Sequence, residues 1–277
     1  MPTDQVRGLK AHRSSPAKKI QGYMNTLPLK LTVTPLLILA ASLASRRWGE
    51  IVGGWFVGLP LTSGPVCFFL ALDQGEGFAA AASLGCLAGA ASEAGFGLVY
   101  GIVARHFGWP LALIAASFGF AVCGVAFAEA ALPLWPLVVA ACAALALALS
   151  LMPRLGEGSV TLARRPRWDI PARMIVATAL VLGLTALAPY VGARLSGLLA
   201  TYPVFAAVLA AFSHQGRGPA AAIQVLRGLL IGLFAFTGFF ALLASTIERF
   251  GVAASFVAAT LLALAIQGCS LWLMRRR

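Results

Sequence analysis

The chain contains two similar halves, related by a shift of 143 residues. This shift aligns Lys30 with Arg173, Leu37 with Leu180, Leu39 with Leu182, Gly49 with Gly192, Gly54 with Gly197 and Pro60 with Pro203. A shift of 141 then aligns Gln74-Gly75 with Gln215-Gly216, and the first shift returns to align Phe107-Gly108 with Phe250-Gly251. Each half holds four apolar segments, and one more lies between them. The second half therefore starts five membrane crossings after the first. Because five is an odd number, the second half enters the membrane from the opposite side, so the sequence predicts an inverted repeat.

The composition indicates a membrane protein. Apolar residues make up 60% of the 277 residues and charged residues 11%, and the mean hydropathy is +0.89, whereas a soluble domain has about a quarter charged residues. Most of the apolar segments reach the ~20 residues that a helix needs to span a bilayer core. The predicted spans are 28–45, 50–72, 78–104, 108–128, 132–152, 172–190, 194–213, 219–246 and 250–273.

These spans predict an all-α, polytopic bundle of about nine helices, arranged as 4+1+4 inverted repeats. The expected parts are a polar and disordered tail (1–25), a first four-helix repeat (26–128), a connecting transmembrane helix (129–152), a cytoplasmic linker (153–171) and a second repeat (172–277). The tail is expected to be disordered because it is polar and rich in charge.

The arginines predict an orientation. Twelve arginines fall in loops on one side of the predicted membrane, against three basic residues on the other, when the first 24 residues are left aside. The positive-inside rule makes the first side cytoplasmic, so we expect a multi-pass protein of a bacterial inner membrane with its N-terminus outside and its C-terminus inside. The basic tail disagrees, which leaves translation starts at Met1 and at Met24 as alternatives.

Two predicted spans are interrupted by proline at matching places. The segment 53–65 has Pro60 and Pro65 among four glycines, with Thr62 and Ser63 between the prolines. The segment 196–203 ends in Thr201, Tyr202 and Pro203. Proline removes a backbone donor and breaks or bends a helix. Matched breaks in two halves are typical of a transporter site, although a simple packing kink is the alternative.

Ionisable residues inside the predicted spans are the other candidates. Glu93 lies in a stripe of small residues formed by Gly85, Gly89, Gly97 and Gly101, a spacing that favours close helix packing. Tyr100 shares this face, and Gln224 and Arg227 share a face of a later span. Similar estimated depths suggest that Glu93 pairs with Arg227. The pair either lines a substrate or proton path or acts as a structural bridge.

Other classes of function have little support in the sequence. The basic residues lie in loops and at the ends, which excludes a soluble nucleic-acid-binding domain. The cysteines have no metal-ligand spacing, and no HExxH or GxSxG motif appears, so we expect no metal, no cofactor and no enzymatic activity.

The second half resembles the small GlpM membrane proteins and related bacterial families. The likeness lies in the residues 197–206, Leu226-Arg227-Gly228 and Glu248-Arg249-Phe250-Gly251, and it covers about 100 residues. It implies a four-span unit whose name is associated with glycerol-3-phosphate use. The architecture is also similar to that of drug/metabolite transporters, which usually have ten spans.

Two hypotheses follow from these patterns. The first is a secondary transporter of a small solute, with the bilayer, the solute and protons as its partners and a site between the repeats. The second is a structural or accessory membrane protein whose glycines serve packing.

Overall fold

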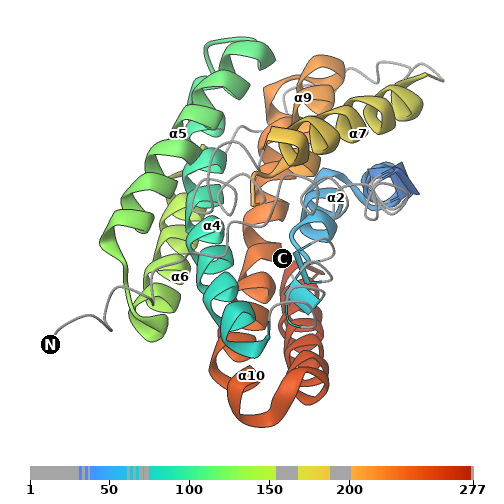
Figure 1. The fold of residues 1–277 in the computed structure, drawn as a ribbon. Coiled ribbons are helices and arrows are strands. Elements are labelled where there is room, and N and C mark those ends of the chain that lie inside the picture. The colour runs from blue at the N-terminus through green and yellow to red at the C-terminus, as the bar shows by residue number, and fades with distance from the viewer. Residues whose placement is uncertain are drawn as a thin grey trace, which may run out of the picture.

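The structure is a bundle of helices. The computed structural model describes residues 31–32, 35–36, 38–60, 63–64, 67–68, 71, 75–153, 168–187 and 201–275, and no strand occurs in this part of the chain. The predicted all-α class is therefore confirmed (Figure 1). After a helical segment at 38–48, the helices are α2 (Glu50–Val57), α4 (Glu76–Val103), α5 (Trp109–Ala130), α6 (Leu134–Leu151), α7 (Asp169–Leu187), α9 (Val204–Arg217) and α10 (Pro219–Arg275).

Four of these helices, α4, α5, α6 and α10, are long and apolar enough to cross a membrane. Large apolar side chains cover the outer faces of α5, α6 and the end of α10, including Ile114, Phe118, Val139 and Leu261. Phe118 is 71% exposed, and such a surface is costly in water but not in lipid. These helices are compatible with an integral membrane protein, as predicted, whereas the nine-span count stays a prediction.

The longest helix, α10, is two helical arms joined by a turn at Gly251. Gly251 has φ 76° and ψ 172°, which is not helical, and a residue with a side chain rarely adopts this φ. Figure 1 shows the chain reversing direction at the end of the first arm. The predicted spans 219–246 and 250–273 lie within these two arms.

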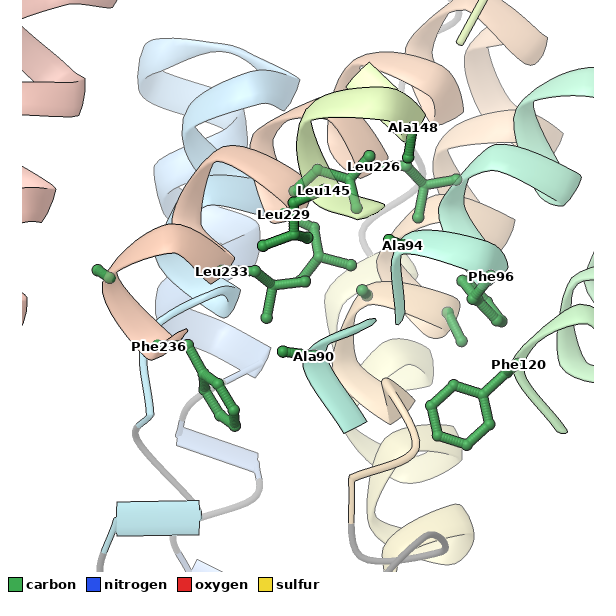
Figure 2. Packing of buried hydrophobic residues seen from close by; sticks show 14 of the residues in the cluster. Ala90, Ala94, Phe96, Phe120, Leu145, Ala148, Leu226, Leu229, Leu233 and Phe236 are labelled. Carbon is green, nitrogen blue, oxygen red and sulfur yellow. The ribbon is translucent and has the colours of Figure 1, made fainter. Parts of the chain in front are cut away.

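The main core lies where α4 packs against α5, α6 and the first arm of α10. Figure 2 shows Leu226, Leu229 and Leu233 of α10 close to Leu145 of α6, with Ala94 of α4 beside them. Small alanines on α4 let the larger leucines of its neighbours fill the space between the helices. A smaller cluster joins Ile38 to Val208 of α9 and Met174 of α7.

The closest helix crossing joins α2 to α10 through four glycines. Gly54 lies against the backbone carbonyl of Val225, and Gly228 lies against that of Ile51. One turn further on, a Cβ atom on Gly58 would lie 2.7 Å from the Cα atom of Gly232. Two GxxxG sequences therefore bring the two backbones into contact, which is the packing mode that membrane helices favour.

The bundle has two chemically different ends. One end carries Arg46, Arg47, Arg105 and Arg217, and we call it the arginine end. Among the described residues, the opposite end carries Glu76, Glu129 and Glu248 with a single arginine, Arg249, and we call it the acidic end. The carboxylate of Glu76 lies beside Gly251, which places the start of α4 and the turn of α10 together. In Figure 1 this turn lies opposite the connection from α4 to α5.

Parts of the predicted organisation lie outside the described residues. The tail 1–25 is one of them, and so are residues 154–167 of the predicted linker. The predicted connecting helix 129–152 corresponds to α6, which begins at Leu134 because Pro133 precedes it.

Candidate functional site

Non-helical residues that end in a proline follow α2 and precede α9, and we call them the first break and the second break. Helix α2 ends at Val57, and residues 58–60, which end at Pro60, are not helical. Helix α9 begins at Val204, after the non-helical residues 201–203, which end at Pro203. Proline cannot donate a backbone hydrogen bond, so each break leaves backbone groups that need other partners.

The second break packs directly against α4. A Cβ atom on Gly89 would lie 2.5 Å from the side chain of Thr201, so only glycine fits there. The ring of Tyr202 lies 5.9 Å from that of Phe96, edge to face, and its hydroxyl is 2.7 Å from Ser117 Oγ. The break is thus held between α4 and α5, in the interior of the protein.

Glu93 lies on the same face of α4 as Gly89 and Phe96. Residues 89, 93 and 96 follow the four- and three-residue spacing that places side chains on one side of a helix. Glu93 is only 7% exposed. Within the described part of the chain, its carboxyl group has no hydrogen bond and no ion pair. An ionised carboxylate at such a depth costs ~2.5–3.5 kcal/mol even on insertion scales, so this residue calls for a functional explanation.

The expected pair of Glu93 with Arg227 is not formed among the described residues. Arg227 Nη1 instead donates to the carbonyl oxygen of Met152, at 3.2 Å. The reason is the register of the antiparallel helices, in which Gly97 lies opposite Leu230 and Gly77 opposite Glu248. Glu93 and Arg227 are then offset by roughly six residues, or about 9 Å along the axis at ~1.5 Å per residue.

Gln224 and Tyr100 lie toward the arginine end, as Arg227 does, and not beside Glu93. Gln224 is half-buried on α10, one turn before Arg227. The hydroxyl of Tyr100 lies 3.2 Å from Nδ1 of His214, near the end of α9. The candidate residues therefore divide into a central group at the second break and a group toward the arginine end.

Other predicted residues have different surroundings. Ser63 is half-buried just after the first break, and Thr62 and Pro65 lie outside the described residues. Of the glycine stripe, Gly97 faces the side chain of Leu230 and Gly101 that of Met152, whereas Gly85 has no described atom within contact distance. The stripe on α4 thus receives side chains, and the backbone contact predicted for it occurs instead between α2 and α10.

A buried ion pair that sequence analysis missed joins α2 to α9. The carboxylate of Glu50 pairs with the guanidinium of Arg217 and accepts a hydrogen bond of 3.0 Å from Ser213 Oγ. Glu50 had been assigned only as the first residue of a span. Its position in a segment with Arg46 and Arg47 was a signal, since an acidic residue on the arginine-rich side needs a partner if it is buried.

A second missed contact supports the first break. The side chain of Gln267, on the second arm of α10, donates to the carbonyl oxygen of Trp55 at 3.0 Å. The indole nitrogen of Trp55 donates to Ser270 Oγ at 2.9 Å. The carbonyl oxygen of Trp55, in the last turn of α2, also accepts from the N–H of Gly58 at 3.2 Å, so the glutamine adds a second donor to this helix end.

The described residues contain no group of three or more histidine, cysteine or acidic side chains that could hold a metal ion. In comparisons with known proteins, no family model, no curated protein and no solved structure matches this chain.

Proposed function

We propose that this chain is a secondary transporter of a small solute, with its site between two inverted repeats. The observation that carries the proposal is Glu93, a buried carboxyl group without a partner among the described residues, beside the break at Thr201–Pro203. Ionisable residues at membrane depth mark substrate or ion paths. Interrupted helices supply backbone groups to such paths in transporters.

A repeated contact supports the inverted arrangement. Gly58 contacts Gly232, and Thr201 contacts Gly89. Adding 143 to position 58 gives 201, and subtracting 143 from position 232 gives 89. The second contact is therefore the repeat-related counterpart of the first. A two-fold axis in the membrane plane would generate one contact from the other.

The turns support the same shift of 143. Gly75 and Gly218, which are 143 residues apart, have φ of 91° and 86° and each precede a long helix. These two turns favour the shift of 143 at this point, whereas Gln74-Gly75 and Gln215-Gly216 favour a shift of 141. The GlpM-like character of the second half is part of the proposal and rests on the residues quoted for it.

The membrane and orientation that we propose are a bacterial inner membrane with the arginine end in the cytoplasm. The contrast between this end and the acidic end supports it, because positive side chains are retained on the cytoplasmic side. Protons are the proposed coupling ion, with Glu93 as their carrier.

The alternative is a structural or accessory membrane protein. The glycine crossing of α2 with α10 favours it, since close backbone packing serves stability without any solute.

Ligand-induced thermal stabilisation of the purified protein, across a library of small metabolites, tests the proposal. A solute that stabilises the protein should also slow the alkylation of a cysteine placed at Thr201 in a cysteine-free background. A cysteine at the exposed Arg105 is the matched control and should react at the same rate with and without the solute. If no solute stabilises the protein and the cysteine at 201 never reacts with an aqueous thiol reagent, the accessory function is favoured.

A further inference from the structure

The start of α9 is a buried helix end with available backbone donors. Pro203 occupies the N-cap position, and no side chain caps the helix. The N–H of Val204 donates to Tyr202 O at 2.7 Å, and the first bond of helical spacing runs from Ala207 to Pro203 O at 2.8 Å. Between them, the N–H groups of residues 205 and 206 have no acceptor among the described residues. Such donors and the helix dipole favour a negative charge.

Glu93 lies on the face of α4 that packs against this helix end. It lies between Gly89, which contacts Thr201, and Phe96, which contacts Tyr202, on one face of α4. It is more than nine-tenths buried, and it lacks a hydrogen bond or ion pair in the described part of the chain. An unpartnered acid and an uncapped helix N-terminus therefore face each other in the interior.

The start of α9 can stabilise one negative charge but not two. With Glu93 ionised, its own carboxylate supplies the charge. When Glu93 is protonated, an anion can bind at the start of α9, and the carboxyl O–H of Glu93 can donate a hydrogen bond to that anion. Two anions at this separation in a medium of low dielectric constant repel each other strongly.

We propose that the start of α9 binds a small oxyanion, such as a carboxylate or phosphate group of the solute, together with one proton on Glu93. This inference rests on the proposed transporter function and names its substrate class and its coupling. Arg173, Arg217 and Arg227 lie toward the arginine end with Glu50 as the buried acid there. Their excess of positive charge would raise the local concentration of anions on that side.

Proton and anion binding are then linked. Where Glu93 is ionised in the free protein, the affinity for the anion falls tenfold for each unit by which the pH rises, because each anion must bring one proton. In Glu93→Gln the amide resembles the protonated acid in shape and donor capacity. This variant should bind the same anion with an affinity that changes less than twofold between pH 5.5 and 8.

The test uses the full-length protein purified in detergent, with acetate, benzoate and dimethyl phosphate as anionic probes, each a monoanion over most of the tested pH range, and with choline and glycerol as cationic and neutral ones. Binding is measured by thermal stabilisation, and proton uptake by a pH indicator in weak buffer. At the pH values at which Glu93 is ionised in the free protein, we expect the wild type to take up about one proton per bound anion, and we expect Glu93→Gln to take up none at any pH. The matched control, Glu129→Gln, changes an exposed glutamate in the same way and should behave as the wild type.

Three results would overturn the inference. Binding of choline or glycerol but of no anion would refute the substrate class and leave the transporter proposal standing. Anion binding with no proton uptake, and with an affinity that stays constant from pH 5.5 to the highest pH at which the wild type remains folded, would refute the coupling, even if Glu93→Gln did not fold. Absence of binding by every probe and by every member of the metabolite library would refute this inference and the proposed function together.

Discussion

At the scale of single residues, the described part of the bundle contains two buried glutamates in different surroundings. Glu50 begins α2, where the last turn of α9 supplies Arg217 and Ser213 as partners. Glu93 lies in the middle of α4, near the thiol of Cys86 and on the face that packs against the start of α9, a helix end without a side-chain cap. A buried carboxylate is tolerated when it is paired. The unpaired one is therefore the candidate for chemistry, and the paired one is a candidate for stability.

The pair Glu50–Arg217 should behave as a unit in stability measurements. Glu50→Gln and Arg217→Gln should each lower the free energy of unfolding by about 2 kcal/mol, because one removes the counter-ion of the half-buried guanidinium and the other leaves the buried carboxylate without its cation. The double variant should cost little more than one of the singles, with a coupling energy of ~1–3 kcal/mol. Thermal unfolding in detergent measures this cycle. Purely additive effects would contradict the ion pair.

Glu93 and Arg227 should behave in the opposite way. Because the register of α4 and α10 separates them by about 9 Å along the axis, the effects of Glu93→Gln and Arg227→Gln on stability should add to within about 0.5 kcal/mol. The same thermal assay on the two single variants and the double variant is sufficient. A coupling energy above 1 kcal/mol would show that the two side chains interact after all.

At the scale of the elements, glycine has two different uses in this bundle. In α2 and α10, Gly54 and Gly228 let two backbones touch. In α4, Gly89 and Gly97 receive side chains from neighbouring elements. Sequence spacing alone shows only that a helix has a narrow face, because the partner that occupies this face comes from elsewhere in the chain.

Two alanine substitutions distinguish these uses. Gly228→Ala places a Cβ atom against the carbonyl of Ile51, and the forced separation of α2 from α10 should cost about 1–3 kcal/mol. Gly85→Ala meets no described atom and should stabilise α4 by up to ~1 kcal/mol, as alanine does in helix interiors. Thermal unfolding of the two variants side by side is the measurement. Equal effects would refute the backbone contact.

At the scale of the whole molecule, the arginine end and the acidic end predict how the protein sits in a membrane. The contact of Tyr100 with His214 brings the ends of α4 and α9 together. The proximity of Glu76 and Gly251 does the same for the opposite ends. Among the described residues, the end of α4 and the end of α9, which the sequence places on one side, therefore lie at one end of the folded bundle.

Cysteine labelling in intact bacteria tests this orientation. In a cysteine-free background, a cysteine at Arg249 should react with a membrane-impermeant maleimide added outside. A cysteine at Arg105 should react only after the membrane is permeabilised. Both arginines are exposed, so accessibility within the protein does not limit either reaction. The reverse pattern would place the arginine end outside and contradict the positive-inside assignment.

Local features of the fold were predictable from the sequence. The breaks at Pro60 and Pro203 and the turn at Gly251 follow from the backbone chemistry of proline and glycine, which acts within one turn of the helix. The burial of Glu93 followed from its place in a narrow face of α4. The ion pair of Glu50 with Arg217 was not predicted, because its members are far apart in sequence and lie at the ends of two helices.

The sequence by itself determined that the chain forms apolar helices, where they break and which loops carry the positive charge. These are consequences of composition and of interactions between near neighbours along the chain. Only the tertiary structure decided which charges meet, because a register difference of a few residues between antiparallel helices moves a side chain by several ångströms. That register left Glu93 beside the start of α9 and took Arg227 to the arginine end.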